Sequence, residues 1–361
     1  MASLVEPSDA RVSAVPPPAQ NTADVVAHEI VADLHAPRPA VFWTDLGLSA
    51  LVGWVAFGIA VAAWPPSWTT AAAVIVSALA LYRGLCFTHE ITHLRRRAVP
   101  GFETAWNLLL GVPLLLPSFT YAGVHQSHHS LSTYGTKDDP EYLPFQRSRR
   151  LILAFALQSS VVLPALLALR FLVLAPVGLV WPALHRWLEV HASSFAMNPA
   201  YRRAVTPAQA RKMRVWEAAT LMFWAVAVAA LAGGLLPMRT LLAWYAVMAG
   251  VSFLNTMRVL GAHEYKTDGE PRDRGGQLAD SIDTPGGPWT GLWAPVGLRY
   301  HALHHYFPGI PYHNLGRAYR RIVGTAPGRQ RYQASSSPSL WHSLRTLYQR
   351  ARRGSAAMVQ W

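Results

Sequence analysis

Three histidines near the C-terminal end of the sequence have the spacing of a metal site. His301, His304 and His305 occupy positions i, i+3 and i+4. Such positions share one face of a helix, so the three imidazoles are expected to converge on a single point. Neutral imidazole is a preferred protein ligand for iron, copper and zinc. The segment therefore predicts part of a metal-binding site.

Further histidines extend this pattern: a second copy of the same spacing, a pair four residues apart, and one histidine after a long apolar run. A single histidine is more often a hydrogen-bonded core or surface residue than a ligand, but chance rarely produces all of these arrangements in one chain. Nine nitrogen ligands are too many for one metal ion and suit two ions with four or five ligands each. The predicted ligands are His89, His93, His125, His128, His129, His263, His301, His304 and His305.

The first histidine pair also matches a zinc peptidase motif. His89-Glu90-Ile91-Thr92-His93 has the H-E-x-x-H spacing, in which both histidines bind zinc and the glutamate acts as general base. An intramembrane zinc metalloprotease is therefore an alternative of a different class. It leaves the other clustered histidines without a role, and the apolar run 240–257 lacks the acidic third ligand such an enzyme needs. In a two-metal centre, Glu90 would at most support a ligand.

Acidic residues near the histidines are candidates to hold the ligand imidazoles in place. A carboxylate that accepts the second ring N–H of a ligand fixes the orientation of the ring. Asp280 could equally cap a helix. The four candidates are Asp139, Glu264, Asp280 and Asp283.

The composition indicates an integral membrane protein. Of the 361 residues, 52% are hydrophobic and only 14% are charged. Runs of about 18 or more uncharged apolar residues are typical of membrane spans, and four of them form two hairpins: Leu46–Ala63 with Pro65–Tyr82, and Ala218–Met238 with Thr240–Met257. The stretches 105–118 and 151–182 contain prolines, which we expect to interrupt the longer stretch, and both predict helices that lie along the membrane or dip into it. We therefore expect an all-α protein with four transmembrane helices, interfacial helices and a histidine-rich cap.

The distribution of lysine and arginine predicts the orientation in the membrane. The two hairpin turns carry one basic residue, Arg239, whereas the other connections are rich in arginine. Both termini and the histidine cap should therefore face the cytoplasm. This asymmetry explains the net charge of +13 without a nucleic-acid partner. The single cysteine, Cys86, excludes an intrachain disulfide and a cysteine-based zinc or iron–sulfur site.

Three regions follow from the composition. Residues 1–40 are polar and proline-rich and predict a flexible tail, and residues 41–330 form the membrane domain. Residues 331–361 contain a linker and a short basic amphipathic helix, which we expect to rest on anionic lipid. The sequence gives no indication of the oligomeric state.

Three motifs together resemble the histidine boxes of the membrane fatty acid desaturase superfamily. They are His-Glu-Ile-Thr-His at 89–93, His-Gln-Ser-His-His at 125–129 and His-Ala-Leu-His-His at 301–305, with a spanning pair between the second and third. The phrase Phe-Pro-Gly-Ile-Pro-Tyr-His-Asn-Leu at 307–315 resembles bacterial members in particular. The resemblance covers residues 41–325 and implies a location in a bacterial inner membrane.

The resemblance also implies the chemistry. The nine histidines would bind two non-haem iron ions, with dioxygen as co-substrate, in an enzyme that introduces a double bond into a lipid acyl chain. A lipid or carotenoid hydroxylase or ketolase on the same scaffold is the alternative, because these enzymes share the three boxes. No segment resembles a haem or ferredoxin module, so the electrons should come from a separate ferredoxin or small haem protein with its reductase.

Overall fold

The computed structural model describes residues 27–63, 65–267 and 269–353. Within these residues every regular element is helical, and the only β-type pairing consists of isolated bridges. The prediction of an all-α protein is therefore confirmed for the described part of the chain. The predictions for residues 1–26 and 354–361 lie outside it.

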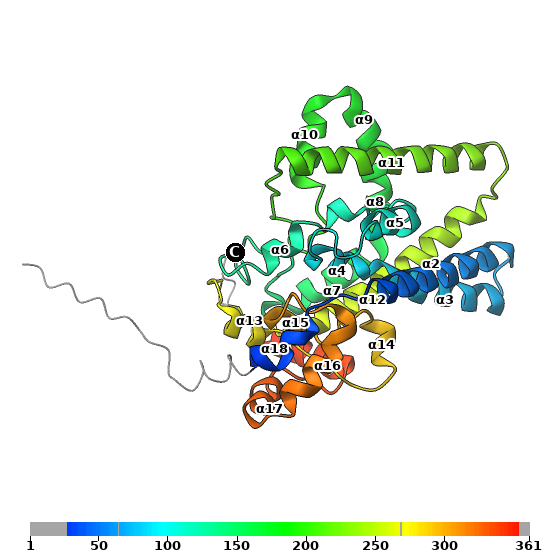
Figure 1. Ribbon diagram of the computed structural model, residues 1–361. Helices are drawn as coiled ribbons and strands as arrows, with labels where there is room; N and C mark the ends of the chain where they lie inside the picture. The colour runs from blue at the N-terminus through cyan, green and yellow to red at the C-terminus, as the bar shows by residue number, and fades with distance from the viewer. Residues whose placement is uncertain (1–26, 64, 268, 354–361) are drawn as a thin grey trace, which may run out of the picture.

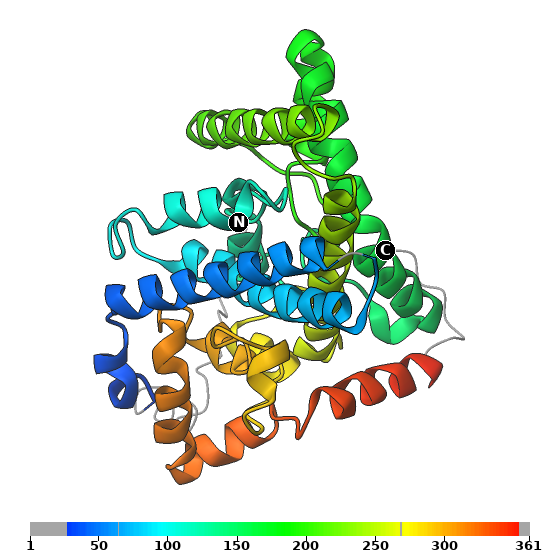
Figure 2. The same ribbon diagram turned by 90° about the vertical axis from the view of Figure 1, so that its right-hand side faces the viewer.

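Two pairs of long apolar helices cover the four predicted apolar runs, but only the first pair packs side by side as a hairpin. The first pair is α2 (Pro39–Ala62) and α3 (Trp68–Leu85), which lie side by side in both views (Figures 1 and 2). The second pair is α11 (Pro207–Ala232) and α12 (Arg239–Ala262). Two of these four helices begin at side-chain caps: the Ser67 hydroxyl accepts the Thr70 N–H at 3.2 Å at the start of α3, and a capping box at Thr206 precedes α11. The cap explains why α11 starts well before its apolar run.

A fifth continuous helix covers residues 149–180 and is also long and apolar enough to cross a membrane. It consists of α7 (Arg149–Leu157), η5 (Gln158–Val162), α8 (Leu163–Ala168), η6 (Leu169–Leu174) and α9 (Ala175–Val180). We expected its prolines to interrupt it. Instead, wide π-helical turns at η5 and η6 precede Pro164 and Pro176 and let the helix continue past them.

This fifth helix runs crosswise to α2, α3 and α11 in both views (Figures 1 and 2). Five helices in the described part of the chain thus meet the length and apolarity of a span, rather than the four that the sequence predicted. A total of four crossings remains a prediction.

Shorter helices surround the histidine-bearing segments. Beneath the first histidine pair, Phe42, Phe87, Phe102 and Tyr312 pack edge to face in a buried aromatic cluster, with ring centroids 5.0–5.6 Å apart for four of the pairs. The shorter helices are α4 (Phe87–His93), α5 (Phe102–Trp106), η2 (Asn107–Gly111), α6 (Val124–His128), α10 (Pro182–His191), α13 (Arg274–Asp280), α14 (Thr290–Trp293), α15 (His301–Tyr306), α16 (Tyr312–Val323), α17 (Ala326–Gln333) and α18 (Leu340–Arg353), with single 3₁₀ turns η1 (Ala32–Leu34), η3 (Ser118–Thr120) and η4 (Phe145–Arg147).

Both ends of the described chain pack against this cap. Val31 and Leu34 are fully buried in the same cluster as Ile310, so the described part of the predicted tail, residues 27–40, packs against the protein. In α18, Leu347 and Ala351 are buried against the rest of the protein. We expected α18 to rest on lipid. Its apolar face instead packs on α12 and α7, because those apolar side chains find a protein partner there.

Candidate metal centre

Four segments far apart in the sequence bring the nine predicted ligands together. α4 carries His89 and His93, α6 ends in the second cluster, His263 follows the last residue of α12, and α15 carries the third cluster. In each of two groups, one ligand atom from every member lies within 4.8 Å of the others. The first group contains His89, His93, His125, His129 and His304, and the second contains His128, His263, His301 and His305.

The division between the groups runs through the second and third clusters. His128 and His129 are adjacent in sequence but belong to different groups, as do His304 and His305. Successive residues on a helix point about 100° apart, because one turn contains 3.6 residues. The prediction that each cluster converges on a single point is therefore wrong. Each of these clusters contributes to both groups.

Local backbone features set the position of α6. Gly123 precedes the helix with a left-handed φ of +86°, and a Cβ there would lie 3.2 Å from Nε2 of Gln209. Only glycine adopts this conformation without strain. The left-handed backbone at Gly123 and the close contact of this residue with α11 together orient α6, so that its histidines face the other ligand-bearing segments.

A short extended segment joins the other two ligand-bearing segments. Ser281 forms a β-bridge with His263, and Asp283 forms one with Tyr300, the residue before α15. The Asp283 carboxylate accepts the Leu303 N–H at 3.2 Å at the start of α15, and burial raises the pKa of this carboxyl to about 7. We predicted that Asp283 would hold an imidazole. It caps the ligand helix instead.

Two carboxylates, the fully buried Asp139 and the partly buried Glu141, hold ligands of the second cluster. Asp139 lies 2.9 and 3.0 Å from Nδ1 of His128, and Glu141 lies 2.8 Å from Nδ1 of His125. Each Nδ1 therefore carries the ring proton and donates it, which leaves the Nε2 lone pair free for a metal. The role of Asp139 was predicted. Glu141 was not, although it lies only two residues further along the chain.

The second group is held partly through a tyrosine. The Tyr134 hydroxyl lies 3.0 Å from Nδ1 of His263 and donates to Asp280 at 3.1 Å. Tyr142 donates to the same carboxylate at 2.7 Å. Asp280 therefore supports a ligand indirectly, and burial raises the pKa of its carboxyl. Nothing in the sequence spacing identified either tyrosine.

Two other acidic residues have different roles from those considered. Glu264 forms ion pairs with Lys266 and Arg350 at the surface and holds no ligand imidazole. Glu90 is buried, accepts the Tyr312 N–H at 2.9 Å and lies 3.5 Å from Nδ1 of His89. Its carboxylate thus anchors the start of α16 beside a ligand, which is the supporting role expected in a two-metal centre.

The ring nitrogens themselves indicate that cations belong here. Nε2 of His129 lies 3.0 Å from Nε2 of His125 and 3.2 Å from Nε2 of His304. In the second group, Nε2 of His301 lies 2.9 Å from Nε2 of His263 and 3.2 Å from Nε2 of His305. One proton on the shared nitrogen satisfies only one of its two contacts. Buried nitrogens without a hydrogen-bond partner add to this deficit: Nε2 of His89, His93 and His128.

A metal ion in each group would accept the lone pairs of these Nε2 atoms and so satisfy them together. Five and four nitrogen donors fit two iron ions that keep positions open for other ligands. Burial lowers the pKa of most cap imidazoles, including His129, His301 and His305, and keeps them neutral, as metal ligation requires. Burial is also the largest single influence on His128 and acts to lower its pKa, but the carboxylates of Asp139, Glu141 and Asp280 together outweigh it and raise the pKa of this ring.

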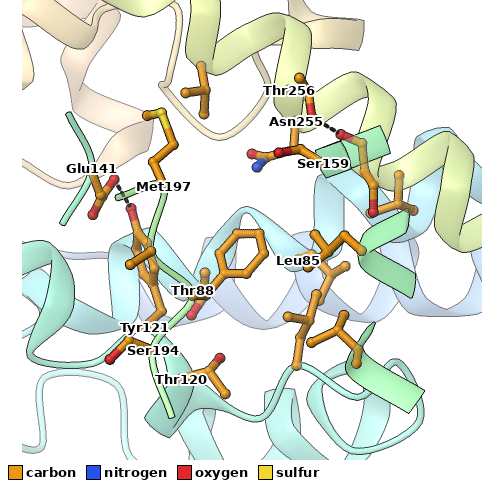
Figure 3. Close-up of a pocket in the computed structure, with 18 of the residues that line it drawn as sticks. Leu85, Thr88, Thr120, Tyr121, Glu141, Ser159, Ser194, Met197, Asn255 and Thr256 are labelled. Carbon is orange, nitrogen blue, oxygen red and sulfur yellow. Dashed lines mark hydrogen bonds between the residues drawn. The ribbon is translucent and has the colours of Figure 1, made fainter. Parts of the chain in front are cut away.

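A mostly apolar cavity of about 390 Å³ adjoins the first histidine group. Its wall includes His89, residues of α3 and α12, and the helix over residues 149–180. Figure 3 shows Tyr121 and Glu141 on one side of the cavity, hydrogen-bonded at 2.9 Å, and Asn255 and Ser159 across from them. Leu85 contributes to the apolar wall between these polar groups.

Comparison with known proteins adds two findings. A model of the fatty acid desaturase family matches residues 62–336, which include all three histidine motifs. The chain is also 40% identical over 335 residues to a protein of Caulobacter vibrioides (strain NA1000 / CB15N) described as a ceramide hydroxylase. That alignment covers 91% of this chain and 94% of the relative.

Proposed function

Since the chain belongs to the fatty acid desaturase family, we propose that it hydroxylates a ceramide or a closely related lipid amide within the membrane. Membership identifies it as an oxygen-dependent oxidoreductase of the di-iron class. The observation that carries the choice of reaction is the identity of 40% to a ceramide hydroxylase over nearly the full length of both chains. The sequence placed desaturation first and hydroxylation second, and this similarity reverses the order.

In the proposed reaction, one C–H bond of the lipid becomes C–OH and the second oxygen atom of dioxygen leaves as water. The balance requires two electrons and two protons from outside. We propose the nine histidines as ligands of two iron ions, which supply the oxidising chemistry when bound. His89, His93, His125, His129 and His304 would hold one ion, and His128, His263, His301 and His305 the other.

The other residues of the site fix geometry and exclude water. Asp139, Glu141 and Tyr134 orient ligand rings through Nδ1, so that Nε2 points inward. The apolar wall of the cavity would bind a hydrocarbon chain, and burial of each CH₂ group stabilises binding by about 0.8 kcal/mol. Which carbon is oxidised would then depend on how the lipid is anchored.

We place the histidine cap on the cytoplasmic side of a bacterial inner membrane, on the basis of the arginine distribution. A separate ferredoxin or small haem protein with its reductase would supply the electrons. An acidic donor suits the basic connections of this face, because complementary charge accelerates encounter.

The test is a comparison of lipids from a host with and without the gene, grown under isotopically labelled dioxygen. Hydroxylation adds one labelled oxygen atom to a ceramide, whereas desaturation removes two hydrogen atoms and adds no oxygen. Unlabelled products with two fewer hydrogens would refute hydroxylation and restore the desaturase prediction. A strain that carries His301→Ala in place of the wild type controls for the host's own enzymes.

A further inference from the structure

Arg258 is a charged residue in an unusual position. It lies on α12, a candidate membrane span, and lines the cavity beside the first histidine group. Elsewhere in the spanning helices, Arg83 pairs with Asp45 at 2.8 Å and Arg170 with Glu217 at 2.6 Å. No carboxylate in the described part of the chain forms an ion pair with Arg258. A charge within a membrane segment that faces a cavity often marks a substrate site.

The hydrogen bonds of Arg258 leave donors available. Its Nη2 donates to Oδ1 of Asn255 at 3.0 Å, and its Nε is buried without a hydrogen-bond partner. Oδ1 of Asn255 accepts this bond with one of its two lone pairs, and both N–H groups of the Asn255 amide remain available to donate to a ligand. Figure 3 places Asn255 beside Ser159 at the cavity wall. This side of the cavity is therefore suited to a ligand atom that accepts hydrogen bonds.

The opposite side of the cavity offers a hydrogen-bond acceptor, the carboxylate of Glu141. Each oxygen of Glu141 accepts one hydrogen bond, from His125 or from Tyr121, and a carboxylate can accept about four. A ligand that carries both a carbonyl and N–H or O–H groups satisfies both sides. A free carboxylate offers only acceptors and would place a second negative charge near Glu141. A neutral lipid amide therefore fits the cavity better than a fatty acid.

The arginine also lies close to the histidines. Arg258 lies four residues before Ala262, the last residue of α12, which corresponds to a rise of roughly 6 Å. His263 follows Ala262, and the cavity that Arg258 lines also contains His89. A lipid whose polar end is bound there would present carbons near that end to the metal ligands. Carbons far along the chain would lie beyond them.

We propose that Arg258, oriented by Asn255, binds the amide carbonyl of the substrate and directs oxidation to carbons near its polar end. The assignment rests on the proposed function for the identity of the amide. In this arrangement Arg258 and Asn255 are specificity-determining residues. The reaction itself, one C–H bond converted to C–OH, is unchanged.

The first test measures binding to the full-length protein in detergent without iron, so that activity plays no part. The probes are a short-chain ceramide and the fatty acid of equal chain length. Arg258→Gln should weaken ceramide binding by about 10- to 100-fold, because it removes hydrogen bonds from a charged donor. Arg258→Lys, which keeps the charge, should lose less. Arg214→Gln, a charge removal at an exposed site on α11, should bind like the wild type.

A second variant covers the case in which Arg258→Gln fails to fold. Asn255→Asp retains the arginine but places a carboxylate next to its guanidinium, so it should engage Arg258 and weaken ceramide binding as well. Unfolding midpoints and iron content identify variants that are merely destabilised. Wild-type ceramide affinity in well-folded Arg258→Gln or Asn255→Asp would overturn the proposal. So would preferential binding of the fatty acid that depends on Arg258.

A product assay separates this proposal from the proposed function. With the wild type, the new hydroxyl should lie near the amide, and in Arg258→Gln the KM should rise and the hydroxyl should spread along the chain. If ceramide is hydroxylated equally well and at the same carbon by Arg258→Gln, the inference fails while the function stands. If the wild type binds ceramide through Arg258 but does not hydroxylate it, the function fails and the binding site stands.

Discussion

Replacement of Asp139 by asparagine tests how far a buried carboxylate secures the second histidine group. Asp139 is fully buried and accepts the Nδ1–H of His128 together with the backbone N–H groups of Gly135 at 2.8 Å and Glu141 at 2.9 Å. In Asp139→Asn, one acceptor oxygen becomes an NH₂ group that faces an N–H donor. The substitution therefore breaks one buried hydrogen bond whichever way the amide turns.

The expected magnitude follows from this geometry. Loss of a carboxylate that orients a metal ligand typically lowers metal affinity by about 10- to 100-fold, which corresponds to about 1.4–2.8 kcal/mol. The unsatisfied buried donor should lower the free energy of unfolding by a further ~1–3 kcal/mol. Because His128 belongs to the second group, one of two irons should be lost before the other.

The assay is iron per chain during dialysis against a chelator, with unfolding followed in parallel. Glu264→Gln is the matched control, since it also removes one carboxylate near His263 but breaks only ion pairs at the surface. It should cost about 1 kcal/mol of stability or less and retain both irons. Equal iron loss in both variants, or unchanged iron affinity in Asp139→Asn, would refute the role given to Asp139.

Three further predictions concern the ligands, pH and topology. Glu90→Gln should keep measurable lipid oxidation, whereas His301→Ala should lose both activity and iron; the opposite pattern would favour a peptidase-type base. Burial lowers the pKa of His301, so the folded centre binds fewer protons than the unfolded chain. Stability and iron retention should therefore fall as pH drops below about 6.5, and retention that is constant to pH 5 would contradict this. Leu235→Cys should react with an impermeant thiol reagent from outside intact cells, whereas Gln349→Cys should react only after permeabilisation. The natural cysteine, Cys86, is buried and should give little background labelling. Labelling of Gln349→Cys in intact cells would contradict the proposed orientation.

The sequence was sufficient to find the nine histidines that the structure gathers, because local spacing reports which residues share a helix face. The sequence did not show how the nine histidines divide into two groups. The assignment of His128 and His129 to different groups depends on where α6 and α15 lie relative to one another. That arrangement is set by contacts such as the Ser281 and Asp283 bridges, which join segments far apart in the chain.

The supporting residues were predictable only in part. Asp139 and Glu141 belong to one short phrase after the second cluster, but only Asp139 was singled out. Tyr134 was missed because a tyrosine beside histidines is usually an ordinary core residue. The helix over residues 149–180 was taken to be broken, since sequence patterns penalise Pro164 and Pro176 but do not reveal the π-helical turns that accommodate them.

The extended segment around Asp283 has a consequence for biosynthesis. Its backbone pairs with the linker before α18, through Asp283 N–H to the Ser335 carbonyl and Ser337 N–H to the Asp283 carbonyl, both at 2.7 Å. This pairing needs residues that leave the ribosome after every candidate membrane helix and all nine predicted ligand histidines. The centre therefore reaches its final shape only when synthesis is nearly complete, so insertion into the membrane comes first and metal acquisition is a late step. A chain truncated before residue 335 would carry all nine histidines and still lack part of the frame that holds them.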